Sequence, residues 1–273
     1  MTKRCYYTII QLTEEISCKL LWRDEEKISS EQERFEIVVL SYWAAPHLVE
    51  RNMEVKHVRE LVLEVWGDFA AFSAPYSKVE RLTYPFPTPS AMRGLLSSIY
   101  SKPKEFFWQI NRIEVLRPIQ YISFKRNEVK CTVSNKPIYT DEERTQRQTV
   151  ALKNVRYRIA ASIVPRKEFW GKEKQLYEQA ERRIRCGKCF CQPSLGMREF
   201  PAYFELYDPE IHTDAPIQDS LDAGLMVYDV FDLHDYSVKK KTTPKLSLFH
   251  AVMEHGIIQI PPYDSTDVLK VVK

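Results

Sequence analysis

Three cysteines close together are the first candidates for chemistry, because cysteine thiolates bind metals. Cys186, Cys189 and Cys191 occur within "RCGKCFCQP", and the first two have the C-x-x-C spacing. A structural zinc site needs four ligands, but the cysteines at positions 5, 18 and 131 form no second pair. We therefore favour a reduced, turn-forming segment over a zinc site, and we expect neither a bound metal nor a cofactor.

Other residue patterns argue against several enzyme classes. The seven glycines of the chain form no glycine-rich phosphate-binding motif, which disfavours a P-loop or a dinucleotide-binding fold. No Gly-x-Ser-x-Gly motif occurs, which disfavours the nucleophile elbow of an α/β-hydrolase. Its six histidines, at positions 47, 57, 212, 234, 250 and 255, avoid both predicted helices and the arginine-rich middle of the chain. The acidic run Asp141–Glu143 lies among arginines, and we interpret it as solvated charge rather than as a pair of metal-binding acids.

A short helix with well-defined ends positions Tyr100. The prolines in "TYPFPTPSAMRGLLSSIYSKP" hold the entry extended, and Thr88 is the predicted N-cap with Pro89 at the first helical position. Apolar residues at spacings of three and four continue to Ile99, and Lys102-Pro103 ends the helix. From these residues alone, Tyr100 either packs at the core edge with its hydroxyl in water or contributes to a functional site.

Charge is distributed unevenly along the chain, although the net charge is only +3. Arg112–Lys188 holds 19 Lys and Arg against 9 Asp and Glu, a sum of +10, whereas Glu205–Lys273 holds 6 against 12, a sum of −6. A basic sector rich in arginine suits the phosphates of a nucleic acid, although both signs could simply cover solvated faces. The candidate RNA-binding residues are Arg144, Arg147, Arg156, Arg158, Arg182, Arg183 and Arg185.

The order of expected elements indicates an α+β fold. Alternation in "HVRELVLEVWG" predicts a strand over 57–67, followed by the helix, by strands over 105–116, 119–129 and 149–164, and by a second helix over 172–187. This order resembles the split β-α-β arrangement of ferredoxin-like, RRM-related folds. The segment from 201 reads as an added antiparallel sheet, so we expect domains over 53–200 and 201–273.

Nothing in the sequence predicts a membrane protein or an exported one. No run of about 18 apolar residues occurs, and the N-terminus reaches acidic residues too soon for a signal peptide. The irregularly spaced cysteines are expected to be reduced. We therefore expect a cytoplasmic protein without a membrane partner.

Five segments, taken in order, resemble the Cas-five family of CRISPR-associated proteins, subtype I-C branch. They are "EVWGDFAAFSAPYSKVERLTYPFPTPSAMRGLLSSIYSKP", "VLRPIQYISFKRNEV", "LKNVRYRIAA", "RRIRCGKCFCQPSLGMREFPAYF" and "AVMEHGIIQIP", spread from about Val55 to Pro262. The resemblance implies a ferredoxin-like domain followed by a C-terminal β-sheet domain. It also implies an endoribonuclease that cuts CRISPR repeat RNA without metal and keeps the 5′ handle of the guide RNA, beside the backbone and large subunits of a type I interference complex.

The resemblance also implies roles for single residues. The catalytic tyrosine of the family's "SIYWKP"-like motif corresponds to Tyr100. Some members carry a Lys-His pair at the start of the second helix, where this chain has "GKEKQLYEQAERR", so Lys174 is the nearest lysine, with Lys172 as the other choice, and no histidine follows. A family histidine after the Cys-Phe pair is Cys191 here. These departures keep a second reading open, a non-catalytic subunit that binds the 5′ handle.

Residues 1–52 lie outside the resemblance. They sum to −2 and contain one strand-like run, "FEIVVLSYWAA". Family members tend to begin near Met53, so we interpret residues 1–52 as an over-long gene start or a lineage-specific extension.

Overall fold

The computed structural model describes residues 59–75, 77, 80–132, 137–235 and 245–270. Val58–Lys273 forms one compact unit, distinct from Met1–His57. The predicted extension over 1–52, including its strand-like run, lies outside the described residues. The described elements are β1 (Glu60–Ala70), α4 (Pro89–Ile99), β2 (Phe106–Val115), β3 (Tyr121–Val129), α5 (Thr140–Glu143), β4 (Arg144–Pro165), η2 (Lys167–Phe169), α6 (Glu173–Arg185), β5 (Tyr203–Leu206), β6 (Leu221–Asp229), β7 (Ser247–Glu254), β8 (Ile257–Gln259) and β9 (Leu269–Lys270).

A nine-stranded sheet dominates the described part of the chain, and its strand pairs are antiparallel. The strand order is β5-β1-β4-β2-β8-β7-β6, with β3 paired to β4 and β9 to β7. Strands that follow residue 200 therefore hydrogen-bond to β1 and to β2, which precede it. The domain boundary predicted at residue 200 stays a prediction.

Helix α4 forms as its sequence predicts. The Thr88 hydroxyl accepts a hydrogen bond of 3.2 Å from the backbone N–H of Ala91, and Pro89 is the first helical residue. The helix buries the predicted apolar stripe of Met92, Leu95, Leu96 and Ile99. Helix α6 also occurs where it was predicted, and Gly187 after its last turn has a positive φ of 61°, as expected of a C-cap glycine.

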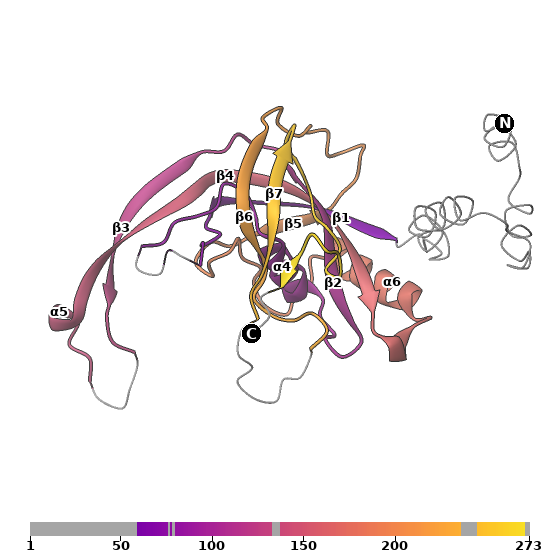
Figure 1. Cartoon of the computed structure of the whole chain (residues 1–273), viewed down its shortest axis with the longest axis horizontal. Coiled ribbons are helices and arrows are strands. Elements are labelled where there is room, and N and C mark those ends of the chain that lie inside the picture. The colour runs from indigo at the N-terminus through magenta and orange to yellow at the C-terminus, as the bar shows by residue number, and fades with distance from the viewer. Residues whose placement is uncertain (1–58, 76, 78–79, 133–136, 236–244, 271–273) are drawn as a thin grey trace, which may run out of the picture. The chain divides into compact units, whose positions relative to one another are not determined.

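Strand β4 is longer than predicted and serves two parts of the molecule. Its second half pairs with β1 and β2, and its first half pairs with β3 in register from Arg144–Val129 to Leu152–Tyr121. Figure 1 shows β3 and this half of β4 running together away from the other strands. The predicted strand began at Thr149 and therefore missed Arg144–Gln148. The less exposed face of this stretch carries Thr145 and Arg147 rather than apolar residues, so the sequence shows little apolar alternation there.

The two faces of the central sheet differ in chemistry. Leu61, Leu63 and Val65 of β1 are buried in the apolar core that α4 and α6 share, which confirms the predicted inward face. Side chains alternate along a strand, so Glu64 points to the opposite face. Register there aligns Glu64 with Arg158 of β4, and Arg158 with Glu114 of β2.

Candidate active site and nucleic-acid interface

Tyr100 occupies the C-cap of α4, where the chain turns from helix to extended backbone. Its N–H donates to the Leu96 carbonyl at 2.8 Å, and its ring stacks on Phe106 with 5.3 Å between the ring centroids. The hydroxyl donates a hydrogen bond of 2.7 Å to Oε1 of Gln179 in α6. The residue is 1% exposed. The alternative that places the Tyr100 hydroxyl in water is therefore wrong, because the hydroxyl is bound by Gln179 of α6.

Charged groups around this phenol set its proton affinity. Burial raises the pKa of Tyr100, and the positive charges of Lys102 and Arg183 act in the opposite direction. The Lys102 ammonium lies 3.1 Å from the Glu105 carboxylate. Burial lowers the pKa of Lys102, but its bond to Glu105 and its proximity to Tyr100 outweigh burial and raise that pKa overall. Lys102 therefore stays charged at neutral pH beside a phenol that stays protonated.

Arg183 links the two helices next to Tyr100. Its Nε donates to the carbonyl of Ile99 at 2.7 Å, and its guanidinium lies 4.2 Å from the ring centroid of Phe190. Among the seven arginines predicted to bind RNA, Arg183 is therefore held one residue away from Tyr100. Reasoning from the sequence missed Lys102 and Gln179. Lys102 could have been found by its position two residues after Tyr100, but nothing in the sequence indicates Gln179.

Lys174 lies in the first turn of α6 and points into solvent. Its side chain is 83% exposed, and its ammonium is 3.9 Å from the Glu178 carboxylate. Lys172 precedes the helix, with its ammonium 5.1 Å from the ring centroid of Phe169. In the described part of the chain, no hydrogen bond or ion pair joins either lysine to Tyr100. A catalytic role for Lys174 stays a prediction.

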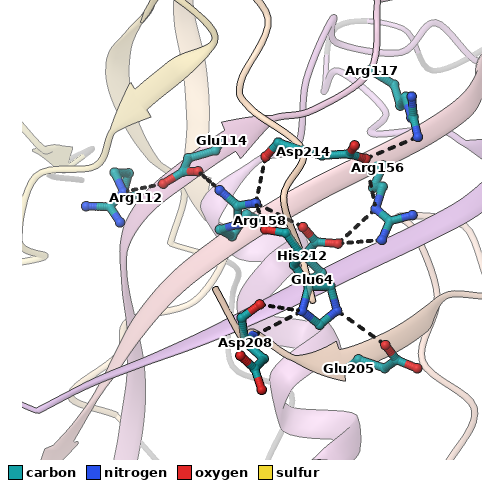
Figure 2. A network of polar contacts seen from close by, with 10 residues as sticks. All are labelled: Glu64, Arg112, Glu114, Arg117, Arg156, Arg158, Glu205, Asp208, His212 and Asp214. Carbon is teal, nitrogen blue, oxygen red and sulfur yellow. Dashed lines mark hydrogen bonds and ion pairs between the residues drawn. The ribbon is translucent and has the colours of Figure 1, made fainter. Parts of the chain in front are cut away.

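Arg156 and Arg158 belong to an ion-pair network on the sheet face opposite the helices (Figure 2). Arg158 donates to Glu114 at 2.8 Å, to Glu64 at 3.0 Å and to the Asp214 carbonyl at 2.8 Å, and its side chain is 9% exposed. Arg156 binds Glu64 at 2.6 Å, and its guanidinium lies 5.3 Å from the Trp66 ring centroid. Both guanidinium groups are therefore engaged with carboxylates in this structure.

The segment after β5 crosses this polar face and completes the network. The Asp214 carboxylate lies 3.1 Å from Arg117 and 3.8 Å from Arg156. His212 is 7% exposed and lies 3.3 Å from the Glu205 carboxylate, and Figure 2 shows its other ring nitrogen directed at the Asp208 backbone. Asp214, from the acidic C-terminal region, thus pairs with two arginines of the basic middle.

The other predicted arginines lie in two separate places. Arg144 and Arg147 are on the β3–β4 hairpin, where Arg144 is exposed and Arg147 lies 3.5 Å from Glu128. Arg182 and Arg185 are exposed on the last turn of α6, and Arg185 lies 2.8 Å from Glu181. The seven candidates therefore divide among the hairpin, the polar sheet face and α6, and the structure does not gather them into one cluster.

Two classes of feature are absent from the described residues. In those ranges, no three His, Cys, Asp or Glu side chains are placed to hold a metal ion together. Cys186, Cys189 and Cys191 are exposed free thiols there. Among the helices that the structure describes, none has the length and apolar character needed to cross a lipid bilayer.

Comparison with known proteins identifies the family. The family model described as CRISPR-associated protein (Cas_Cas5), for Cas5d, matches residues 60–261. The chain belongs to this Cas5 family of CRISPR-associated proteins, as its sequence motifs predicted. It is 38% identical over 212 residues to a "CRISPR pre-crRNA endoribonuclease Cas5d" of Thermus thermophilus, covering 74% of this chain and 91% of that protein. It is 35% identical over 226 residues to a protein of the same name from Mannheimia succiniciproducens, covering 76% and 96%.

Solved structures share the fold. A functionally uncharacterized protein, SMU1763c from Streptococcus mutans, matches with a TM-score of 0.54 and 22% identity, covering 77% of this chain and 96% of that one. A structure described as a CRISPR-associated protein matches with a TM-score of 0.55 and 21% identity over the same shares. At these identities the comparison establishes a Cas5-like fold, a mostly antiparallel sheet with few helices.

Proposed function

We propose that the chain is an endoribonuclease that cleaves the repeat RNA of the CRISPR precursor transcript without a metal ion and keeps the 5′ handle. The names of two relatives, at 38% and 35% identity, support this activity. The observation that carries the proposal is the arrangement around Tyr100, where a protonated phenol lies beside the cations Lys102 and Arg183. The partners we propose are CRISPR repeat RNA, the guide RNA, and the backbone and large subunits of a type I complex.

The chemistry of RNA cleavage matches this set of groups. The 2′-hydroxyl must lose a proton, the phosphorane must be stabilised, and the 5′-oxygen must gain a proton as it leaves. The raised pKa keeps the phenol protonated at neutral pH, so its O–H can donate a proton to the leaving 5′-oxygen or a hydrogen bond that orients the 2′-hydroxyl. Lys102 and Arg183 supply positive charge for the phosphorane. RNA has to displace Gln179 from the phenol before a phosphate can reach it.

The fold proposal is a ferredoxin-like, RRM-related unit followed by a C-terminal sheet domain. Its support is the order β5-β1-β4-β2, in which β1-α4-β2 and β4-α6-β5 are two β-α-β halves whose strands interleave. The strands β6, β7 and β9 would belong to the C-terminal domain, with β8 joining it to β2. Expression of residues 53–206, which include β5, tests whether this unit folds independently, and comparison with residues 53–200 tests the boundary predicted at residue 200.

A non-catalytic subunit that binds the 5′ handle is the second candidate. It is favoured by the 1% exposure of Tyr100 and by the missing Lys-His pair. Incubation of the full chain with its own repeat RNA in EDTA separates the two functions, because only the endoribonuclease yields discrete products.

The decisive variant for the active site is Tyr100→Phe, which keeps the ring stack and removes only the hydroxyl. We expect single-turnover cleavage to fall by a factor of about 10² or more, as for a lost acid–base group, while RNA affinity barely changes. Tyr177→Phe is the matched control, because the Tyr177 hydroxyl in α6 donates to the Glu60 carbonyl. We expect this variant to cleave RNA at the wild-type rate. Lys174→Ala should slow cleavage if the lysine acts on the bound RNA.

Two outcomes would contradict the proposal that Tyr100 forms an endoribonuclease active site. Wild type that cuts nothing without metal would favour the handle-binding function. Cleavage by Tyr100→Phe at the wild-type rate would leave Tyr100 as a packing residue between α4 and α6.

A further inference from the structure

We infer that a pocket beside the loop after Tyr100 binds one unpaired nucleotide of the RNA, with the base stacked on Trp170. This inference rests on the proposed function, because it assigns the pocket to the same RNA. The pocket has a volume of about 420 Å³ and is lined by Lys104, Phe107, Lys167, Trp170 and His234, among others. Its size falls in the range of small-molecule sites.

Trp170 is the stacking surface. It lies between η2 and α6, next to Gly171 with its positive φ of 90°, and it is 65% exposed. Of the three tryptophans that the structure describes, Trp108 is buried and Trp66 is partly buried against Tyr203, at 6.1 Å between ring centroids. A base binds an aromatic face without regard to its sequence, so an exposed indole in a pocket fits a nucleotide.

Cations at the rim of the pocket match a phosphate. Lys104 and Lys167 are both exposed, and within the described residues neither forms an ion pair. The opposing acid Asp264 is already bound, at 2.8 Å from His234 and 3.3 Å from Lys270. The lining also includes the exposed carboxylate of Glu168, so among the described residues of the lining the two ammonium groups outnumber the one carboxylate without an ion pair. This balance favours an anionic ligand such as a phosphate over a cationic one.

The wall of the pocket is fixed before any ligand arrives. The Arg166 guanidinium donates to three backbone carbonyls, those of Pro103 at 2.8 Å, Leu233 at 3.1 Å and His234 at 3.0 Å. It therefore ties the loop after Tyr100 to the end of β4 and to the segment after β6. A preformed site loses less entropy on binding.

The pocket lies near the surroundings of Tyr100. A second cavity of about 190 Å³ shares Phe107 and Arg166 with it and is also lined by Ser101 and Phe106. Phe106 stacks on Tyr100, whereas Phe107 faces the pocket. Lys102, near Tyr100, and Lys104, at the pocket, belong to the same loop over 101–105, so an RNA strand that reaches Tyr100 can extend to the pocket.

The test is an RNA-binding measurement with the full chain and a repeat RNA made non-cleavable by a 2′-deoxy substitution. Stacking on an aromatic side chain contributes roughly 1–3 kcal/mol per base, so Trp170→Ala should weaken affinity about 5- to 150-fold. Trp170→Phe should retain most of it. Tyr203→Ala is the matched control, since Tyr203 is 55% exposed outside the pocket.

An abasic scan along the RNA makes the test specific. One abasic position should weaken binding to wild type and have no further effect on Trp170→Ala, because both changes remove the same stack. Tryptophan fluorescence should be quenched by RNA in wild type, and this quenching should be lost in Trp170→Phe.

Several results would overturn the inference. One is that Trp170→Ala binds RNA with the affinity of wild type. Another is that, at every RNA position, the loss of affinity from an abasic site adds to the loss caused by Trp170→Ala. Normal RNA binding with lost binding to a purified backbone subunit would make the pocket a protein-docking site instead. The binding assay uses RNA that cannot be cut, so its result does not depend on cleavage. If wild type fails to cleave repeat RNA in the separate EDTA experiment, the proposed endoribonuclease activity is refuted, but the proposed nucleotide pocket is not.

Discussion

Replacing Arg158 with alanine should destabilise the fold rather than act on RNA directly. The change removes the guanidinium shared by two carboxylates on the sheet face, Glu64 at 0% and Glu114 at 10% side-chain exposure. Each carboxylate keeps one other partner, Arg156 for Glu64 at 2.6 Å and Arg112 for Glu114 at 2.9 Å. Removing one member of a buried ion pair costs about 3–5 kcal/mol when the remaining charge is left uncompensated. Because each carboxylate here keeps a second guanidinium, we expect a loss at the lower end, about 3 kcal/mol. For a folded unit of roughly 200 residues, this corresponds to a melting temperature lowered by roughly 6–12 °C.

The assay is urea unfolding followed by circular dichroism, with thermal melts alongside. Arg182→Ala is the matched control, since Arg182 is exposed on α6 and a surface change of this kind alters stability by no more than about 0.5 kcal/mol. Arg158→Met should lose less stability than Arg158→Ala, because its side chain fills the space left by the guanidinium while Arg156 still pairs with Glu64 and Arg112 with Glu114.

The reasoning would be refuted if Arg158→Ala unfolded at the wild-type urea concentration and temperature. If that stable variant also lost RNA affinity, the guanidinium would leave the network to bind RNA, as its place in the basic sector predicted. Measuring affinity on folded protein at low temperature distinguishes this from a loss through unfolding.

Three further predictions concern alkaline pH, salt dependence and the N-terminal region. Burial raises the pKa of Tyr228 from 10.0 to about 12, so the folded state keeps a proton that the unfolded state releases. The stability that this group contributes should be intact below pH 10 and fall by roughly 3 kcal/mol as pH rises through 12. Burial also raises the pKa of Tyr263 to about 12, so Tyr228→Phe should reduce the fall in urea titrations at each pH without abolishing it. Replacing Arg182 and Arg185 with Ala should weaken binding to all RNA sequences. It should also reduce the slope of log affinity against log salt concentration by about one unit for each phosphate that the protein no longer binds. If filter binding gives the wild-type affinity and slope, α6 is not part of the RNA interface. A chain beginning at Met53 should remain soluble and bind repeat RNA like the full chain, because the family match begins at residue 60, whereas loss of soluble protein would show that residues 1–52 contribute to the fold.

Local sequence determined the elements that depend on neighbouring residues. Thr88 and Pro89 define the start of α4 through one side-chain hydrogen bond and one missing donor, and both lie within three residues of the helix start. Alternation over Leu61, Leu63 and Val65 predicted β1 because one face of that strand is buried. Where no face is buried, as in the β3–β4 hairpin, the same method missed the first five residues of β4.

The family motifs also allowed the sequence to single out Tyr100, but not the groups that surround it. Gln179 and Arg183 reach the end of α4 from a helix about 80 residues later. No periodicity encodes this contact, since it depends on how α4 and α6 pack on the sheet.

Only the tertiary structure decided what the arginines of the basic middle do. Summed charge predicted one phosphate-binding set, because a sum treats every guanidinium as equally available. Register places Arg158 between Glu64 and Glu114, 94 and 44 residues earlier, and the segment after β5 brings Asp214 to Arg156. Coulomb interactions depend on distance in space and on burial, and neither quantity can be read from the order of residues along the chain.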